Sequence, residues 1–291
     1  MAIHPTAIVS PKAELAADVE VGPYVIIEGC ARIGAGTRIH ARAHIGDHTD
    51  LGRENEIHIG AIVGHLPQDR KYQGKPSFLK VGDRNIFREN AWVHRGSAEG
   101  SSTVIGNDNY FMGGAHVAHN CTIGNGNTIA SNALLAGHLE IEDRAYVSGN
   151  VVVHQFCRIG RLSFVSGLSA VGKDVPPFVT VGGRPAAVVG LNKEGLKRAN
   201  IPTPVREALK TAYKLLFRSE MDIAQALDVI AASATSQEER HLVEFIRKSR
   251  QGPKARGICT APRRHAQPGL EADGDEDGLA TEEATSLLGM S

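Results

Sequence analysis

Hydrophobic residues recur at every sixth position over the first two thirds of this sequence. From Ile3 to Val171 that position holds Val, Ile, Leu or Phe, and only Asp69, Lys75 and Glu99 interrupt the series. The next residue is often Gly, whose missing side chain permits tight turns. A period of six fits neither an α-helix, which repeats about every 3.6 residues, nor a strand with simple alternation.

The period of six predicts a solenoid of short strands joined by turns. Each strand directs one apolar side chain into a shared interior, and successive coils stack on one another. A hexapeptide repeat of this kind is typical of a parallel β-helix. The pattern does not show the handedness of the coils. We expect an all-β solenoid plus α fold, with the β-helix over residues 1–190.

The repeat keeps its phase across its interruptions, which predicts loops that leave an intact solenoid. The first loop covers about residues 64–80 and the second about 94–103. Loops on a rigid scaffold often carry binding and catalytic residues. These two loops are therefore the first candidates for functional residues.

The last third of the sequence changes to a helical pattern over residues 191–250. Thr203-Pro204 is a typical helix start, and an apolar stripe follows it. Ser236 and Glu239 have the spacing of a capping box for a later helix. We expect these helices to form a C-terminal domain that caps the solenoid.

Composition and charge exclude several classes of protein. Lys plus Arg and Asp plus Glu both number 32, so the formal net charge is zero, which argues against a nucleic-acid binder. The four cysteines show no CxxC spacing, so we expect neither a disulfide framework nor a zinc site. We see no secretory signal and no membrane span, which makes the cytoplasm the expected location. Clustered charge in residues 251–291 predicts a disordered tail.

Six polar phrases occur within the repeat and just after it, and they contain polar residues that a β-helix does not need. They are Pro67-Gln68-Asp69-Arg70-Lys71-Tyr72, His94-Arg95-Gly96-Ser97, His116-Val117-Ala118-His119-Asn120-Cys121, Ala136-Gly137-His138, Val153-His154-Gln155-Phe156-Cys157-Arg158-Ile159-Gly160 and Asn192-Lys193-Glu194-Gly195-Leu196-Lys197-Arg198. In this order, over about residues 1–250, they closely resemble the bacterial UDP-N-acetylglucosamine O-acyltransferases. Many acyltransferases share the hexapeptide repeat, whereas the ordered set of phrases is specific.

The resemblance implies a fold, an assembly and a reaction. The fold is a left-handed parallel β-helix of hexapeptide repeats with a C-terminal helical domain, assembled as a homotrimer with active sites between subunits. The reaction moves a 3-hydroxyacyl group from acyl carrier protein to the glucosamine 3-position hydroxyl of UDP-N-acetylglucosamine. This is the first step of lipid A biosynthesis, and it uses no cofactor.

Acyl transfer from a thioester to a hydroxyl needs a base and a donor for the developing oxyanion. Histidine suits the first role because its ordinary pKa lies near neutrality, and a backbone N–H suits the second. The resemblance assigns these roles to His119 and Gly137. The family commonly has an acidic residue directly after the base, where this chain has Asn120. Either another acid supplies the charge, or His119 is a weaker base here.

The resemblance also assigns substrate-binding residues. They are Gln68, Asp69, Lys71, His116, His138, His154, Gly167, Asn192, Glu194 and Arg198. Gly167 matches a position that sets the depth of the acyl groove, which predicts a long chain. A guanidinium at Arg198 suits a phosphate, although Ala199 replaces a second basic residue that the family often has. Acyl carrier protein is acidic, and Arg70, Lys71 and Arg95 are candidates for the surface that receives it.

Three alternatives remain at this stage. An N-acyltransferase of the same pathway usually has an added N-terminal uridine-binding domain, for which the repeat starting at Ile3 leaves no room. A non-catalytic scaffold explains the repeat but not the polar phrases. A metal-dependent hydratase would hold zinc between subunits, whereas we expect no metal site. The remaining histidines receive no role from the sequence: they include His40, His44, His48, His58 and His65.

Overall fold

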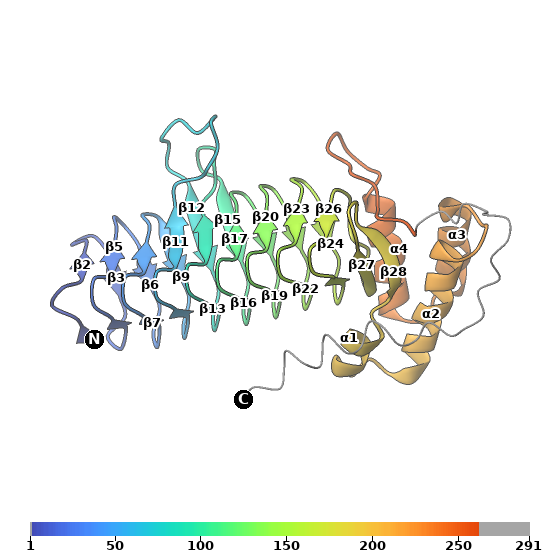
Figure 1. The fold of residues 1–291 in the computed structure, drawn as a ribbon, viewed down its shortest axis with the longest axis horizontal. Coiled ribbons are helices and arrows are strands. Elements are labelled where there is room, and N and C mark those ends of the chain that lie inside the picture. The colour runs from blue at the N-terminus through green and yellow to red at the C-terminus, as the bar shows by residue number, and fades with distance from the viewer. Residues whose placement is uncertain (1, 262–291) are drawn as a thin grey trace. The chain divides into compact units, whose positions relative to one another are not determined.

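The structure is a computed structural model that describes residues 2–261. Short strands form three stacks along one axis, which confirms the predicted left-handed parallel β-helix (Figure 1).

Sheet A joins β1 (Ala2–Ile3), β4 (Glu20–Val21), β7 (Arg38–Ile39), β10 (Glu56–Ile57), β13 (Ile86–Phe87), β16 (Tyr110–Phe111), β19 (Thr128–Ile129), β22 (Tyr146–Val147), β25 (Phe164–Val165), β27 (Val179–Gly182) and β28 (Ala187–Leu191). Sheet B joins β2 (Ile8–Val9), β5 (Ile26–Ile27), β8 (His44–Ile45), β11 (Ile62–His65), β14 (Trp92–His94), β17 (His116–Val117), β20 (Leu134–Leu135), β23 (Val152–Val153) and β26 (Ala170–Val171). Sheet C joins β3 (Glu14–Leu15), β6 (Arg32–Ile33), β9 (Thr49–Leu51), β12 (Phe78–Val81), β15 (Ser102–Ile105), β18 (Thr122–Ile123), β21 (Glu140–Ile141) and β24 (Arg158–Ile159).

The six-residue period arises because each repeat supplies one strand and one turn, and three repeats complete a coil. Equivalent positions of successive coils pair in register, so Ile57 lies between Ile39 and Phe87. Phe87 in turn stacks on Phe111 with ring centroids 4.8 Å apart, the usual spacing of neighbouring strands. The repeat residues thus form continuous apolar columns inside the β-helix.

The turns between sheets align as corners along the β-helix. The B–C corner contains the turns 118–121, 136–139 and 154–157, which join sheet B to sheet C. The A–B corner contains turns such as 58–61 and 166–169. At the B–C corner Asn120, His138 and Phe156 occupy the same position of successive coils, all with φ between 60° and 65°. Side chains of the B–C corner therefore stack in a column on the outside.

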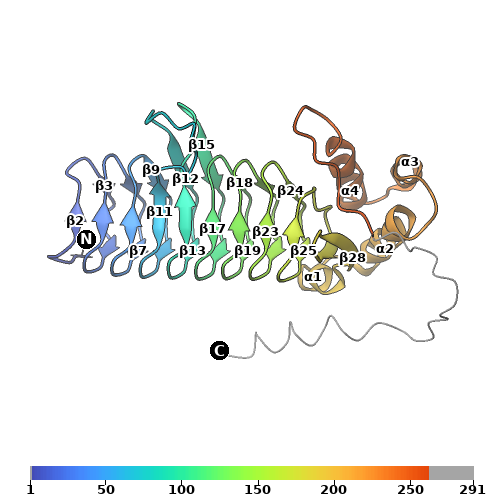
Figure 2. The same ribbon diagram turned by 45° about the horizontal axis from the view of Figure 1, so that its top comes forward.

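Two loops project at the interruptions of the repeat, one between β11 and β12 and the other between β14 and β15. Figure 2 shows both leaving the same side of the β-helix. The Arg95 N–H donates to the His65 carbonyl at 3.1 Å, and the Gly96 N–H donates to the Phe78 carbonyl at 3.1 Å. These bonds join the bases of the two loops.

Within residues 2–261, four helices follow the last coil. They are α1 (Lys193–Arg198), α2 (Thr203–Phe217), α3 (Ile223–Ser233) and α4 (Gln237–Lys248). The capping box of Ser236 and Glu239 is present at the start of α4. None of the helices in residues 2–261 has the length and apolar character needed to cross a membrane.

The chain after α4 differs from the expected tail over its first residues. Ile258 pairs with Asp174 in a β-bridge, and the Cys259 side chain is buried. The sequence placed the start of a disordered tail at residue 251, but burial of these two side chains holds the chain against the last coil. The rest of that predicted tail, residues 262–291, lies outside the described residues.

Candidate active site

His119 lies where the first loop meets the B–C corner. It follows β17, and its Nε2 is 3.9 Å from Asp69 Oδ2 of the loop after β11. The His138 ring, one coil further along, meets the His119 ring edge to face with centroids 5.2 Å apart. The His119 side chain is 14% exposed. The base predicted from the sequence is therefore enclosed by three polar phrases but still open to solvent.

The orientation of His119 follows from its neighbour Asn120. The Ser97 N–H and hydroxyl both donate to Asn120 Oδ1 at 3.0 Å, which fixes the oxygen of this amide in place. His119 Nδ1 is 2.9 Å from the same oxygen. Because a carbonyl oxygen only accepts, Nδ1 carries the proton and Nε2 keeps its lone pair. Nε2 lies 3.9 Å from Asp69 Oδ2.

Gly137 is required because the His119 ring lies across it. A Cβ at Gly137 would be 2.8 Å from His119 Cε1 and 2.9 Å from Nε2, closer than packed atoms allow. The carbonyl of Gly137 accepts from the Phe156 N–H at 3.3 Å. Its own N–H has no acceptor within residues 2–261 and stays available for a ligand.

Asp69 is ionised and positioned by its own loop. The Lys71 N–H donates to Asp69 Oδ1 at 2.9 Å and lowers the pKa of that carboxyl, and Ser97 and His119 lower it further. The second carboxylate oxygen remains directed at His119. Gln68 and Lys71 beside it have exposed side chains.

Two residues of the second polar phrase hold the first loop in place. His94 is buried, and its Nδ1–H donates to the Leu66 carbonyl at 2.7 Å. The Arg95 guanidinium donates to the Asp47 carbonyl at 2.9 Å and to the Tyr72 hydroxyl at 3.2 Å. Arg95 is only 7% exposed, so its assignment to a surface for acyl carrier protein is wrong. Its charge braces the loop instead.

His116 lies on the face of sheet B rather than in the corner. Its ring meets Trp92 and His94 edge to face, and its Nε2 is buried with no partner among residues 2–261. Burial, followed by repulsion from His94, lowers the pKa of His116 to about 4. The ring is neutral at neutral pH and retains an unused polar atom for a ligand.

Lys254 is a residue near the site that sequence reasoning missed. Its Nζ lies 4.2 Å from the centroid of the Phe156 ring, which stacks on His138 at 4.9 Å. Burial lowers the pKa of His138, and the charges of His119 and Lys254 lower it further. The basic character of the segment after α4 was the available signal. Its distance in sequence from every polar phrase concealed the connection.

The other predicted site residues lie elsewhere on the chain. His154 is exposed at the B–C corner, and its Nδ1 lies 3.1 Å from the Gln155 carbonyl. Gly167 lies at the A–B corner, where the strands of sheet B begin, whereas His119 lies at the B–C corner, where they end. Glu194 pairs with Lys197 at 3.0 Å on α1, and Arg198 of the same helix is exposed.

Asn192 has both ends of its amide engaged. Its Oδ1 accepts from the Gly195 N–H at 3.0 Å as the cap of α1, and its Nδ2 donates to the Leu162 carbonyl at 2.9 Å. Asn192 therefore fastens α1 to the β-helix.

Known proteins are similar to this chain over most of its length. The family model described as UDP N-acetylglucosamine O-acyltransferase, domain 2, matches residues 174–259, and the model for the bacterial transferase hexapeptide matches residues 102–137. A curated acyl-[acyl-carrier-protein]–UDP-N-acetylglucosamine O-acyltransferase from Janthinobacterium sp. (strain Marseille) is 42% identical over 256 residues, which are 86% of this chain and 98% of that protein. The enzyme of that name from Anaeromyxobacter sp. (strain Fw109-5) is 43% identical over 254 residues, covering 87% and 99%.

Solved structures give the same result. The UDP-N-acetylglucosamine acyltransferase of Francisella novicida superposes with a TM-score of 0.85 at 34% identity, covering 93% of this chain and all of that one. The UDP-N-acetylglucosamine acyltransferase of Bacteroides fragilis superposes with a TM-score of 0.83 at 37% identity, covering 88% and 99%. The likeness spans both the β-helix and the helices.

Proposed function

Because this chain belongs to the family of acyl-[acyl-carrier-protein]–UDP-N-acetylglucosamine O-acyltransferases, we propose that it transfers a 3-hydroxyacyl group from acyl carrier protein to the glucosamine 3-hydroxyl of UDP-N-acetylglucosamine. This reaction begins lipid A biosynthesis. The observation that carries the proposal is the pairing of His119, with its Nε2 lone pair exposed, and the free N–H of Gly137 beneath it. A cytoplasmic location belongs to the same proposal.

The proposed mechanism is general-base catalysis without a covalent enzyme intermediate. His119 Nε2 takes the proton of the sugar hydroxyl while the hydroxyl oxygen attacks the thioester carbonyl carbon. The Gly137 N–H donates to the oxyanion that forms as the carbon–oxygen bond is made. The carbon–sulfur bond then breaks, and the departing thiolate takes the proton back from Nε2. Asp69 stabilises the transient imidazolium from 3.9 Å.

Asn120 supplies orientation for this base but no charge. We expect Asn120→Ala to lower kcat by about tenfold, because His119 Nδ1–H then loses the acceptor that fixes its tautomer. Asn120→Asp should instead raise kcat a few-fold, since a carboxylate keeps the same bonds and stabilises the imidazolium. Both variants are measured at saturating substrate. Equal rates for all three proteins would contradict this role for Asn120.

Gly137→Ala should lower kcat/KM by about 100-fold. The added methyl group forces the His119 ring away from its position, and a displacement of about 1 Å is enough for a loss of this size. Gly190→Ala on β28, outside both corners, is the control, because a Cβ there would meet no atom within 4 Å. If both variants retained wild-type kcat/KM, Gly137 would have no special part in catalysis.

The positions of the predicted substrate residues support an active site shared between chains. His119 and Gly167 lie at opposite ends of the strands of sheet B. One chain therefore does not bring its catalytic corner and its groove-limiting glycine together. A neighbouring copy that places its A–B corner against the B–C corner would complete the site. We therefore retain the homotrimer as part of the proposal.

The outward face of sheet B offers a surface for such an assembly. Its exposed side chains form an apolar stripe of Ile8, Ile26, Trp92, Leu134 and Val152. The equivalent outward positions of sheet C are largely charged: they include Glu14, Arg32, Asp50, Lys80, Glu140 and Arg158. A largely apolar face on one side of a solenoid, interrupted here by His44 and His116, favours burial against another chain.

Roles for the remaining residues follow from their surroundings. Asn192 holds α1 in place, and the exposed guanidinium of Arg198 is then available for the diphosphate of the nucleotide sugar. Lys71 and Gln68 on the first loop, with His138 and His154 at the corner, line the path toward the sugar. Gly167 leaves space for a long acyl chain.

The decisive experiment supplies the purified chain with 3-hydroxymyristoyl-acyl carrier protein and UDP-N-acetylglucosamine and measures the acylated sugar. A second acceptor with an amine at the 3-position shows whether the reacting atom is oxygen or nitrogen. Donors of shorter chain length test the Gly167 prediction, which a profile that peaks at short donors would refute. Failure of every donor with both acceptors would refute the proposed reaction.

A further inference from the structure

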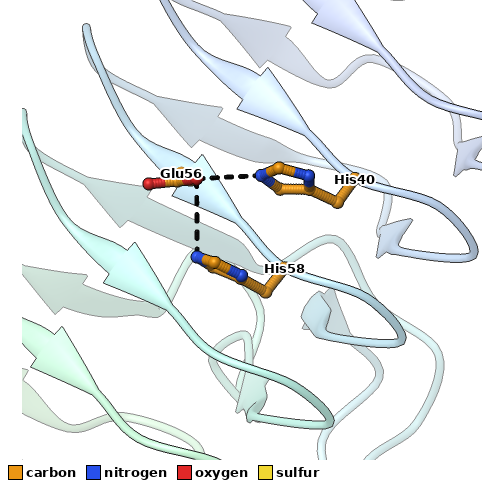
Figure 3. A group of neighbouring side chains, drawn as sticks. All are labelled: His40, Glu56 and His58. Carbon is orange, nitrogen blue, oxygen red and sulfur yellow. Dashed lines mark hydrogen bonds and ion pairs between the residues drawn. The ribbon is translucent and has the colours of Figure 1, made fainter. Parts of the chain in front are cut away.

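A second group of ionisable side chains lies at the A–B corner, away from His119. His40 follows β7, and His58 occupies the same position one coil later, after β10. Their rings stack with centroids 4.8 Å apart, matching the spacing of the strands that carry them. Glu56 of β10 lies beside both rings, and Figure 3 shows its carboxylate facing each of them. Neither histidine is used in the proposed reaction.

Both imidazoles direct Nε2 at one carboxylate oxygen. His40 Nε2 is 2.9 Å from Glu56 Oε1, and His58 Nε2 is 3.5 Å from the same atom (Figure 3). His58 Nδ1 lies 3.5 Å from Glu89 Oε1, which favours a proton on Nδ1 and a lone pair on Nε2. A lone pair and a carboxylate oxygen then face each other, and a cation between them would relieve their repulsion.

The chemical types of the side chains suit a metal ion. Imidazole nitrogens and carboxylate oxygens are ligands that zinc takes in proteins. The nearby Arg88 guanidinium is held by Glu89 and by the Tyr110 hydroxyl.

We propose that His40, Glu56 and His58 form a binding site for a divalent transition-metal ion, with Zn²⁺ as the preferred occupant and Glu89 as the partner that orients His58. The ligand atoms of the three residues all lie within 4.8 Å of one another, and among the described residues this is the one such group. Tetrahedral zinc with bonds of about 2.0–2.1 Å places its ligand atoms about 3.3 Å apart. The separations of 2.9 Å and 3.5 Å from Glu56 Oε1 bracket that value, and side-chain rotations that bring the two imidazole nitrogens to the same spacing would complete the site.

The ligand types determine which ions fit. Two imidazoles with one carboxylate favour Zn²⁺, Ni²⁺ or Cu²⁺ over Mg²⁺ or Ca²⁺, which prefer oxygen ligands. Partial exposure of the three side chains leaves room for water in the remaining position. The bound ion would join two successive coils of the β-helix and so stabilise the folded chain.

The test is a calorimetric titration of ZnCl₂ into the full chain, stripped of metal by EDTA and dialysed near neutral pH. We expect one zinc ion per chain, no binding of Mg²⁺, and a melting temperature that rises with zinc. Glu56→Gln and His58→Gln should each weaken zinc binding by more than about tenfold and abolish the thermal shift. His44→Gln is the matched control, because His44 Nε2 faces Glu28 Oε1 at 3.1 Å but His44 belongs to no group of three close ligand atoms among the described residues. That variant should bind as wild type does.

Replacing zinc with Co²⁺ gives an independent readout, since tetrahedral cobalt absorbs visible light strongly. The visible band should appear in the wild-type chain and the His44→Gln control and be lost in Glu56→Gln. Wild-type zinc affinity in both Glu56→Gln and His58→Gln would place the metal elsewhere and overturn the proposal, as would an absence of zinc binding in the wild-type chain. Acyl transfer should be unaffected by EDTA, so this result stands or falls separately from the proposed reaction.

Discussion

Replacing His119 with Gln is expected to lower kcat/KM for acyl transfer by about 1000-fold. Glutamine fills most of the space of the imidazole but cannot take a proton from the sugar hydroxyl near neutral pH. General-base catalysis contributes about 10²–10⁴-fold, and the enclosed position of His119 favours the middle or upper part of that range. The measurement is steady-state transfer from 3-hydroxyacyl-acyl carrier protein. Circular dichroism and size-exclusion chromatography of the variant should match wild type.

Cys121 provides the matched control for His119. It lies two residues away in the same turn, where its thiol is fully buried and donates to the Ala136 carbonyl at 3.2 Å. Burial raises the pKa of Cys121 to about 12, so the thiol does not serve as a nucleophile. Cys121→Ala should therefore retain kcat/KM within about twofold. High activity in His119→Gln together with an inactive Cys121→Ala would replace the general-base mechanism with a covalent one.

The β-helix could be predicted from the sequence because its information is local and repeated. The apolar residue at every sixth position shows which side of each strand faces inward. In-register pairs such as Ile57 with Ile39 follow from that. The same rule places His119 and Gly137 at one corner, since they occupy the same turn position of successive coils. Their contact could be anticipated from spacing alone.

Contacts made by segments that leave the repeat could not be predicted in this way. Arg95 was assigned to the surface because a charged residue in a loop phrase usually faces solvent, yet the neighbouring loop folds over it. Lys254 reaches Phe156 only because the chain after α4 returns to the β-helix. The sequence assigns no role to His40 and His58 because each is an isolated histidine along the chain. Stacking of coils makes them neighbours.

The apolar stripe on sheet B leads to the second prediction with a large effect. Leu134→Glu should convert a particle of three 31.0 kDa chains into single chains, as measured by sedimentation equilibrium. Leu134 is 46% exposed in the single chain, so a charge there costs the isolated β-helix little. Within an interface the same charge loses water without gaining a partner. The threefold axis would repeat this cost at each contact.

Acyl transfer should disappear together with the assembly. Gly167 and His119 of one chain lie at opposite ends of the strands of sheet B, so a single chain does not form the whole proposed site. Thr122→Glu is the control, because Thr122 is an exposed outward residue of sheet C. This variant should leave both the particle mass and the acyl-transfer activity unchanged. A Leu134→Glu variant that dissociates yet keeps full activity would show that one chain contains a complete site. A variant that stays trimeric would move the interface away from sheet B. Only joint loss of mass and activity supports a site built where the stripe of one chain meets its neighbour.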